Sequence, residues 1–540
     1  MITNLMVESG QETRNTMAIT KQKIAIIGAG WYGCHLALTL QKAGHDVTLF
    51  EKNADIFSGI SGEFGIRLHT GLHYPRSQET RNDCQRGFKE FIHEYPELVI
   101  DHEYSVYGLG AEDADGNAPK VNEEEFKKVS MELTDSQTLG DLSHYKGLLT
   151  ATDIVEPSIV IGSRLRETFR KYLRDAGVTI RCNYGVNDIG PPPHAYISNG
   201  SSTESFDKVI NTTSYQSLVP ERVDFPFEME VTYQPCLALI YEDTRPGEKP
   251  ISFIVMDGWF PCMMPCIDNF ETEKLTTRKY ILTHGKWTIM ASKETPQEAY
   301  QILNEVNDDF INKSIKPFSE GEMNRFWPEF GERFRYVGWK GQVLAKLKTR
   351  KEFRSALTYE QDGTIYVFPG KISNVFDVER EVKSLLLNDD FVLTNGRYRY
   401  VPEGVLEHSR EEIAQKPVFG EPNTTMLQTF AELQQQTYHY PTPSDPSYEI
   451  NLIISYNFQL QCLASLVAAL AALAFISIIL PLLGAKALAL AGSAAIIGAG
   501  YSKYSLFANS QQLTQQASTD FECIPLERFN QPAMSLTTGY

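Results

Sequence analysis

The sequence predicts an α/β fold in which two separated stretches of chain form a parallel sheet, an antiparallel sheet domain is inserted between them, and a hydrophobic helical hairpin follows. Three observations carry this prediction. A strand–turn–helix–strand pattern occupies residues 23–51, alternating strand-like runs fill residues 229–341, and a run without charge extends over residues 462–483. The first pattern combines strand and helix periods, the second has strand-like alternation, and the third is continuously apolar. These differences indicate three structural parts.

Residues 23–51 have the order of a Rossmann-type unit, KIAIIGAGWYGCHLALTLQKAGHDVTLFE. The apolar run at 24–27 predicts a buried strand, and residues 47–50 predict a second one. Between them, a glycine-rich turn leads into apolar residues at helical spacing. The second strand ends at Glu51, where this fold places an acidic residue that binds the ribose of a dinucleotide.

Each glycine of the turn has a physical role. Gly28 allows a tight turn, Gly30 lets a pyrophosphate approach the backbone, and Gly33 lets the helix pack close to the strand. The N-terminal N–H groups of the helix would face the phosphates. The unit therefore predicts dinucleotide contacts from Gly28, Ala29, Gly30, Gly33, Glu51 and Lys52. A Rossmann-like unit without a nucleotide is the alternative.

The composition is that of a globular protein and argues against several classes. The chain has 540 residues and a formal net charge of -18, so nucleic acid is not an expected partner. Its 8 cysteines lack the spacing of a zinc site or a disulfide framework, so no metal is expected. The first residues, MITNLMVESGQETRN, have no apolar core, which predicts a flexible N-terminus over 1–20 and no secretory signal peptide.

The order of the patterns predicts a discontinuous first domain, formed by residues 21–214 and 346–395. Strand-like segments at 206–213 and 355–374 would return to the sheet begun at residue 24. The runs CLALIYED, ISFIVMDGWF and KYILTHGKWTIMAS predict an antiparallel substrate domain over 215–345. Residues 396–450 are rich in proline, glutamine and charge, which predicts a linker.

The C-terminal region predicts a transmembrane hairpin over residues 451–507, followed by a polar tail over 508–540. The run at 462–483 has about 22 residues without a charge, enough to cross a bilayer. A second apolar run rich in small residues would allow close helix packing or self-association. We expect membrane lipid as a partner and the large N-terminal part in the cytosol. A buried helix of a soluble domain is the alternative.

Residues 21–387 resemble the FAD-dependent oxidoreductases of the D-amino-acid-oxidase-like superfamily. The segment SGISGEFGIRLHTGLHYPRS, residues 58–77, resembles their loop along the pyrophosphate and flavin; FDKVINTT resembles a late strand near FAD; and FPGKISNV, residues 368–375, resembles the loop facing the flavin pyrimidine ring. One departure is Glu63-Phe64-Gly65, where the family usually has an asparagine-like residue. The resemblance implies FAD as cofactor and adds the binding residues Ser61, Arg67, Leu68, Thr212, Gly370, Lys371 and Ile372.

The same resemblance implies that a C–H bond beside an amine or hydroxyl donates hydride to the flavin. An anionic substrate favours arginine, for which Arg354 is a candidate. His69 or His73 would accept the substrate proton, and Tyr74 follows directly. The candidate catalytic residues are therefore His69, His73, Tyr74 and Arg354. A loop that only hydrogen-bonds the cofactor, and an ion-paired surface arginine, are the alternatives.

The predicted function is an FAD-dependent oxidoreductase that transfers hydride from a small substrate bearing an amino or hydroxyl group, anchored to a membrane. The arginines would suit an anionic form of that substrate. Two alternatives stay open. One is a flavin-dependent nucleotide-sugar mutase, and the other is a membrane-anchored FAD-fold binding protein with little activity.

Overall fold

The computed structural model describes residues 20–64, 66–133, 136–190, 195–220, 229–256, 258–266, 278–348, 353–388, 391–394, 396–402 and 404–408. They all lie in the first of two compact units, Met1–Tyr440. Within these ranges, every helix is too short or too polar to cross a bilayer. The predicted hairpin, polar tail, N-terminal segment and most of the predicted linker lie outside the described residues.

The first sheet has 8 strands in the order β21-β22-β19-β20-β13-β1-β2-β9. Its centre is parallel, because β1 pairs with both β13 and β2, and β13 pairs with β20. The strands are β1 (Lys23–Ile27), β2 (Asp46–Phe50), β9 (Thr179–Arg181), β13 (Lys208–Asn211), β19 (Leu357–Gln361), β20 (Thr364–Phe368), β21 (Val392–Thr394) and β22 (Tyr398–Tyr400). Strands far apart in the sequence therefore meet in one sheet.

Four helices belong to this part of the fold: α1 (Trp31–Lys42), α3 (Gln78–Glu94), α5 (Gly162–Ala176) and α10 (Val375–Leu387). The Ser77 hydroxyl caps α3 by accepting from the Thr80 N–H, and α5 ends at Gly177 in the left-handed conformation. Trp31 lies in the core between these helices, with its ring centroid 4.9 Å from that of Phe169 and 5.3 Å from that of Phe91. This aromatic cluster holds α1 against its neighbours.

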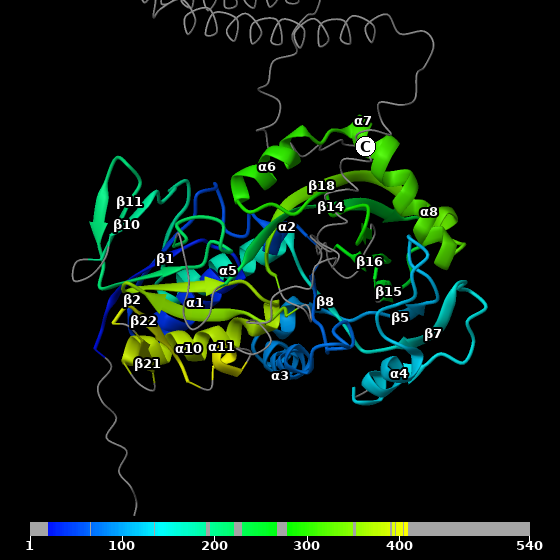
Figure 1. Ribbon diagram of the computed structural model, residues 1–540. Helices are drawn as coiled ribbons and strands as arrows, with labels where there is room; N and C mark the ends of the chain where they lie inside the picture. The colour runs from blue at the N-terminus through cyan, green and yellow to red at the C-terminus, as the bar shows by residue number, and fades with distance from the viewer. Residues whose placement is uncertain are drawn as a thin grey trace, which may run out of the picture. The chain divides into compact units, whose positions relative to one another are not determined.

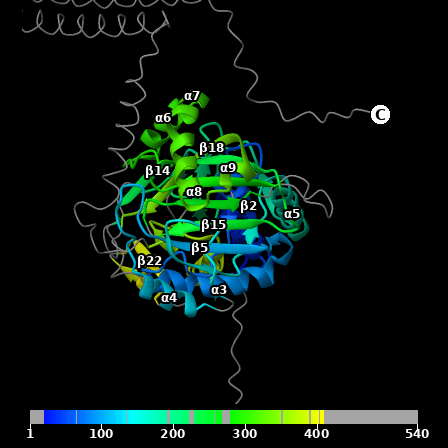
Figure 2. The ribbon, with the colours of Figure 1, turned by 90° about the vertical axis from the view of Figure 1, so that its right-hand side faces the viewer.

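The second sheet also has 8 strands, in the order β18-β14-β17-β16-β15-β5-β7-β6. They are β5 (Tyr104–Gly110), β6 (Gln137–Thr138), β7 (Leu148–Asp153), β14 (Val231–Asp243), β15 (Ile251–Met256), β16 (Pro261–Pro265), β17 (Lys279–His284) and β18 (Phe334–Leu347). Figure 1 shows α6 (Pro296–Glu305) and α8 (Lys316–Phe326) along the long β14–β18 pair. Figure 2 shows the strands from the side on which α8 lies.

Smaller elements complete the described chain. They are α2 (Ile60–Glu63), β3 (Ile66–Arg67), η1 (Pro96–Leu98), β4 (Val99–Ile100), α4 (Glu123–Met131), β8 (Ser158–Ile159), β10 (Asp188–Gly190), β11 (Tyr196–Ser198), β12 (Thr203–Ser205), α7 (Asp308–Phe310), η2 (Ile311–Ile315), α9 (Phe330–Arg333), η3 (Ile372–Asn374) and α11 (Val405–His408). Two small sheets, β3-β8-β4 and β10-β11-β12, lie outside the two large ones.

Two predicted boundaries differ from the structure. Residues 104–153 were expected in the first domain, but β5, β7 and β6 extend the second sheet, because β5 pairs in parallel with the distant β15. The predicted linker begins too early, since β22 joins the first sheet and Tyr398, Tyr400 and Leu406 are buried. Both differences arise from long-range strand pairing, which leaves no local pattern in the sequence.

Candidate functional site

The turn between β1 and α1 is built on contacts that only glycine permits. Gly28 has φ +99°, and a Cβ there would lie 2.8 Å from the Thr212 carbonyl oxygen. A Cβ on Gly33 would lie 1.8 Å from the Gly28 carbonyl oxygen. The Thr212 hydroxyl lies 2.9 Å from the Ile27 carbonyl oxygen and 2.8 Å from that of Gly28. Thr212, expected near the cofactor, thus holds the turn itself.

Gly30 differs from its neighbours, because its surroundings are open. A Cβ there would meet only the flexible side chain of Ser61, whose Oγ would be 3.0 Å away. Gly30 is also the N-cap of α1, and no side chain caps this helix. The N-terminal N–H groups of α1 are therefore accessible from the side of Gly30 and Ser61, as an anionic pyrophosphate requires.

The carboxylate of Glu51 lies beside this turn. Its Oε2 accepts the Ala29 N–H at 3.0 Å, and its Oε1 accepts the backbone and side-chain N–H groups of Asn53 at 2.9 and 2.7 Å. A carboxylate has about four acceptor positions, so Glu51 can also accept from ribose hydroxyls. Lys52 is exposed and lines a surface cavity of about 600 Å³ together with Gln216 and Tyr300.

The loop after β20 is joined to α1 through Tyr32. The Gly370 N–H donates to the Tyr32 hydroxyl at 3.0 Å, and this hydroxyl donates to the Lys371 carbonyl oxygen at 2.6 Å. Gly370 is backed by the chain at Ala356, where a Cβ would lie 2.1 Å from the backbone nitrogen. Ile372 begins η3 and packs against the core of the first sheet. The predicted residues Gly370, Lys371 and Ile372 thus lie next to α1.

A buried carboxylate, Glu156, organises the segment that follows β3. Its Oε2 lies 2.5 Å from the Tyr107 hydroxyl, 3.4 Å from His69 Nδ1 and 3.7 Å from Arg67 Nη1. Its Oε1 accepts the N–H of Thr70 at 2.7 Å and the Thr70 hydroxyl at 3.1 Å. The Arg67 and Glu156 side chains are 1% and 0% exposed. Glu156 thus gathers two predicted site residues, Arg67 and His69, around one negative charge.

The predicted catalytic residues His69, His73 and Tyr74 lie together with Lys371. The two imidazole rings are stacked with centroids 5.0 Å apart, and Tyr74 contacts both rings edge-on. The Lys371 Nζ lies 4.3 Å from the centroid of the Tyr74 ring. The structure therefore brings residues 67–74 and 370–372 to one place, although they are about 300 positions apart in the sequence.

Burial controls the charges of this cluster. It lowers the pKa of His69 to about 4, against the opposing effect of Glu156, and lowers that of His73 well below its ordinary value. Burial also lowers the pKa of Lys371 to about 7. Burial alone would raise the pKa of Glu156, but its interactions with His69, Arg67 and Tyr107 hold it at about 2. Since both imidazoles are neutral at pH 7, the charge that keeps Glu156 ionised there is that of Arg67.

Several buried polar atoms of the cluster have no hydrogen-bond partner among the described residues. They are all three guanidinium nitrogens of Arg67, Nδ1 of His73 and the Tyr74 hydroxyl. A buried donor without a partner is costly, and such atoms in a native protein need an explanation. These atoms are therefore available to a bound ligand.

Other predicted residues lie elsewhere. The Leu68 side chain is fully buried in the apolar core, and its N–H donates to the Pro157 carbonyl oxygen at 2.9 Å. Arg354 is half-buried, and its charge acts on the Cys236 thiol of β14. Glu63 pairs with Arg166 of α5 and, at 2.7 Å, with Lys340 of β18. Its carboxylate therefore links helix α5 to the second sheet.

Sequence reasoning missed Glu156, Tyr107 and Tyr32. Tyr107 lies on β5 in the second sheet, and Glu156 lies between β7 and β8, so neither is near a recognisable motif. One signal for Glu156 is present, because it is the one charged residue in the mostly apolar run IVEPSIVIG, residues 154–162. Tyr32 is inside the glycine motif but at a position to which the motif assigns no role.

Comparison with known proteins agrees with this architecture. The model of the "FAD dependent oxidoreductase" family (DAO) matches residues 23–243. The FAD-dependent monooxygenase kojA of Aspergillus flavus is 46% identical over 424 residues, which covers 77% of this chain and 98% of that protein. The FAD-dependent monooxygenase FPY4 of Fusarium mangiferae is 27% identical over 377 residues, covering 69% of this chain and 93% of that protein.

Solved structures show the same fold at low sequence identity. Glycine oxidase from Geobacillus kaustophilus superposes with a TM-score of 0.51 and 13% identity, covering 69% of this chain and 96% of that one. The amino acid oxidase NikD gives a TM-score of 0.50 and 14% identity, covering 70% and 96%. The predicted α/β fold is thereby confirmed, as are the predicted FAD cofactor and oxidoreductase activity.

Replacing Glu156 by glutamine tests the buried charge pair. In Glu156→Gln the Arg67 charge would stay buried without its counter-ion, so we expect a loss of about 3 to 5 kcal/mol in the free energy of unfolding. Urea unfolding followed by tryptophan fluorescence measures it. Glu123→Gln is the control, because Glu123 and its partner Lys127 are 44% and 46% exposed and such pairs contribute at most about 1 kcal/mol. Equal unfolding midpoints for the two variants would contradict this role of Glu156.

Proposed function

Since the chain belongs to the family of FAD-dependent oxidoreductases, we propose that it oxidises a small anionic substrate by hydride transfer to FAD at the site formed by residues 28–33, 67–74 and 370–372. The observation that carries the proposal is the convergence of these three segments. Tyr32 hydrogen-bonds Gly370 and Lys371, and Lys371 lies 4.3 Å above the Tyr74 ring. The loop at residues 370–372 therefore lies between the glycine turn, which would bind the phosphates, and the polar cluster of residues 67–74, several of whose buried polar atoms have no hydrogen-bond partner among the described residues.

The residues of the site fit FAD. The open approach at Gly30 and the uncapped N-terminus of α1 suit the pyrophosphate, and the remaining acceptor position of Glu51 suits a ribose hydroxyl. The loop at Gly370–Lys371 would meet the flavin ring. When bound, FAD supplies the acceptor for a hydride, and the protein supplies binding, orientation and charge.

Arg67 and Lys371 support an anionic substrate. The Arg67 guanidinium stays charged at all relevant pH values, and none of its nitrogens has a hydrogen-bond partner among the described residues. Lys371 has a pKa of about 7, so an anion beside it would favour the protonated amine. Glu156 lies 3.7 Å from Arg67 Nη1, beyond hydrogen-bond distance, so the N–H groups of Arg67 could still donate to a substrate carboxylate.

His69 is the best-placed residue to accept the substrate proton. Its pKa of about 4 leaves the ring neutral at pH 7, as a proton acceptor requires. Glu156 lies 3.4 Å from its Nδ1 and remains ionised, so it would orient the ring and stabilise the imidazolium that forms. In this reaction His69 would take the proton from the substrate amine or hydroxyl, while the hydride of the substrate C–H bond would go to bound FAD.

A second candidate is monooxygenation, because the curated relatives named above are described as FAD-dependent monooxygenases. Monooxygenation transfers one oxygen atom of O₂ to the substrate, releases the other as water, and consumes two electrons from a reductant such as NADPH. Oxidation by hydride transfer needs no such reductant, and O₂ then becomes hydrogen peroxide. Both reactions use the same FAD, so they differ in their electron source and in the fate of oxygen.

Anaerobic reduction of the flavin separates the two candidates. Bleaching of the flavin absorbance by small amino or hydroxy acids, with no NADPH present, supports hydride transfer from the substrate. Bleaching by NADPH alone, followed by incorporation of ¹⁸O from ¹⁸O₂ into the product, supports monooxygenation instead. If the FAD-loaded protein is bleached by neither, the proposal of an anionic substrate is wrong.

We also propose that residues 462–483 anchor the enzyme to a membrane, with the FAD-binding part on the cytosolic side. The support is the length of this run without a charge. Carbonate extraction of the full-length protein from membranes tests the anchor. Release of the full-length chain into the soluble fraction would contradict it.

Substitution of Gly30 by valine should abolish FAD retention while leaving the fold intact. The added side chain would project toward the flexible Ser61 and into the approach to the N-terminus of α1, so it would block the pyrophosphate. The ratio of flavin absorbance to protein absorbance after purification measures retention. Gly140→Val is the control, because a Cβ at Gly140 meets no atom within 4 Å. Wild-type flavin content in Gly30→Val would contradict the assignment of this turn.

Binding of an anion at the cluster should weaken as the pH rises. Lys371 loses its proton as the pH passes about 7, while His69 and His73 are already neutral, so the dissociation constant of benzoate should be constant below about pH 7 and rise up to about tenfold per pH unit above it. Benzoate titrations followed by the flavin difference spectrum measure this. Lys371→Met should bind benzoate weakly at every pH, and neutral benzamide should show no pH dependence in the wild type. A pH-independent benzoate affinity would argue against Lys371 as an anion ligand.

A further inference from the structure

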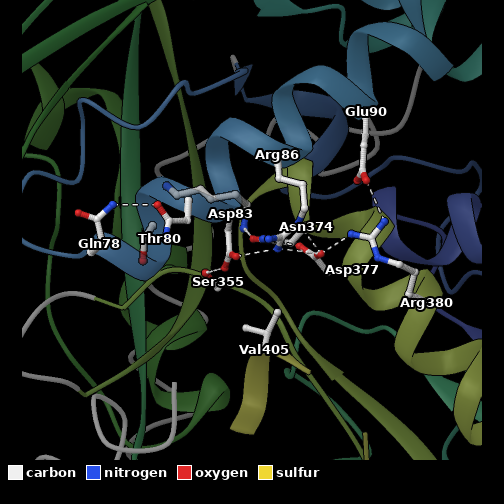
Figure 3. Close-up of polar contacts among 12 residues, drawn as sticks. Gln78, Thr80, Asp83, Arg86, Glu90, Ser355, Asn374, Asp377, Arg380 and Val405 are labelled. Carbon is white, nitrogen blue, oxygen red and sulfur yellow. Dashed lines mark hydrogen bonds and ion pairs between the residues drawn. The ribbon is translucent and has the colours of Figure 1, made fainter. Parts of the chain in front are cut away.

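The loop at residues 370–374 is held from behind by a polar network (Figure 3). The Lys371 N–H donates to Asn374 Oδ1 at 2.8 Å, and Asn374 Nδ2 donates to Asp377 Oδ2 at 3.3 Å. Asn374 is fully buried, so its side-chain amide has a defined orientation. Through Asn374, the backbone of Lys371 is connected to the first turn of α10.

Asp377 is the centre of this network, and it receives charged partners from two helices. Arg86 of α3 donates to Asp377 Oδ1 through Nη2 at 2.9 Å and through Nε at 3.2 Å. Arg380 of α10 donates to the same oxygen at 2.5 Å, and its other nitrogen donates to Glu90 at 2.9 Å. Asp377 is buried, whereas the Arg86 and Arg380 side chains are 45% and 51% exposed. The carboxylate thus joins the loop to two solvent-reachable cations.

Arg86 also connects the loop to the chain that supports it from the other side. Its Nη2 donates to Asp83 Oδ1 at 2.7 Å, and the other oxygen of Asp83 accepts from the Ser355 hydroxyl. Ser355 precedes Ala356, whose backbone nitrogen would be 2.1 Å from a Cβ on Gly370. Arg86 therefore contacts the carboxylate behind Asn374 directly, and it is connected through Asp83 to the segment packed on Gly370.

Packing makes this position sensitive to small shifts. A Cβ on Gly87 of α3 would lie 2.4 Å from the Ser373 carbonyl oxygen, so α3 and η3 are in direct contact. Because α3 and η3 are closely packed, a shift of α3 would also move the loop. The same helix face carries Asp83 and Arg86, which line a cavity of about 560 Å³ with Asp377 and Glu381.

Arg86 balances the negative charges of two carboxylates near the loop, Asp83 and Asp377. Burial raises the pKa of Asp83, and the charge of Asp377 adds to this effect. Burial also raises the pKa of Glu381 to about 7, again with contributions from Asp377 and Asp83. Arg86 is the cation that hydrogen-bonds both Asp83 and Asp377. Its removal would take a cation away from both carboxylates and leave Arg380 on Asp377.

We propose that Asp377 and Arg86 are positioning residues of the flavin site, which act through Asn374 to set the geometry with which the 370–372 loop meets FAD. The inference rests on the proposed function, in which this loop contacts the flavin ring. Neither residue touches the predicted catalytic cluster. A displaced loop would move the Lys371 backbone and amine, and a positive group beside a flavin favours its reduced, more negative form.

Asp377→Asn and Arg86→Met test the proposal in the full-length flavoprotein. Asparagine would present an amide to the donating Asn374 Nδ2, and methionine removes the cation. We expect FAD to bind roughly tenfold more weakly in each variant, as for the loss of a hydrogen bond to a charged group. We also expect a lower flavin midpoint potential and a shifted visible absorption band. Arg86→Lys should restore part of each effect, because it keeps the charge but loses the fork geometry.

Lys383→Met is the matched control on the same helix. Lys383 pairs with Glu379 of α10 and is 38% exposed, without contact to the loop. It should leave the FAD affinity, the midpoint potential and the absorption band unchanged. A merely structural role of the network would lower the melting temperature but leave the potential and the band of the bound flavin at wild-type values.

The outcomes separate this inference from the proposed function. A wild-type protein that binds no FAD would refute the proposed function itself. A flavin-loaded wild type whose Asp377→Asn and Arg86→Met variants keep its FAD affinity, potential and spectrum would overturn the positioning role alone. If Asp377→Asn does not fold, Arg86→Met and Arg86→Lys decide the question, since Arg86 is half-exposed.

Discussion

The site depends on the close approach of α1 to the end of β1. Gly33 lies against the Gly28 carbonyl, and Thr212 holds the same turn from the neighbouring strand β13. Because this contact leaves no room for a side chain, the first turn of α1 has one position relative to the sheet. Tyr32 is in that turn, and its hydroxyl holds the loop at Gly370 and Lys371. The close packing of Gly33 on Gly28 therefore also fixes, through Tyr32, the loop that carries Lys371 to the polar cluster.

The second determinant of the site is its charge. A buried carboxylate, Glu156, balances Arg67, and burial keeps the two imidazoles neutral and brings the pKa of Lys371 to about 7. Such a cluster can receive an anion without placing an excess of positive charge in the interior. It also keeps a neutral proton acceptor next to a fixed negative charge. The proposed oxidation of an anionic amine or alcohol would use both features.

The sequence was informative where the chemistry is local. The glycine turn, Glu51 and the histidine loop could be identified because each needs particular residue types at short spacing. The placement of Leu68, Arg354 and Glu63 could not, since each of them contacts or interacts with residues that are distant in the chain. Leu68 is in the core, and Glu63 of α2 pairs with Lys340 of the second sheet. Tyr107 and Glu156 had no motif at all, because their partners are distant in the chain.

The sequence by itself determined the parallel α/β class, the turn for a dinucleotide and the FAD family, because strand and helix periods and glycine sterics are properties of short segments. Tertiary structure alone decided that β5 and β7 join the second sheet, that β22 joins the first, that Glu156 meets His69 and that Lys371 meets Tyr74. The physical reason is that strand pairing and the desolvation of charged groups depend on neighbours that only the folded chain brings together.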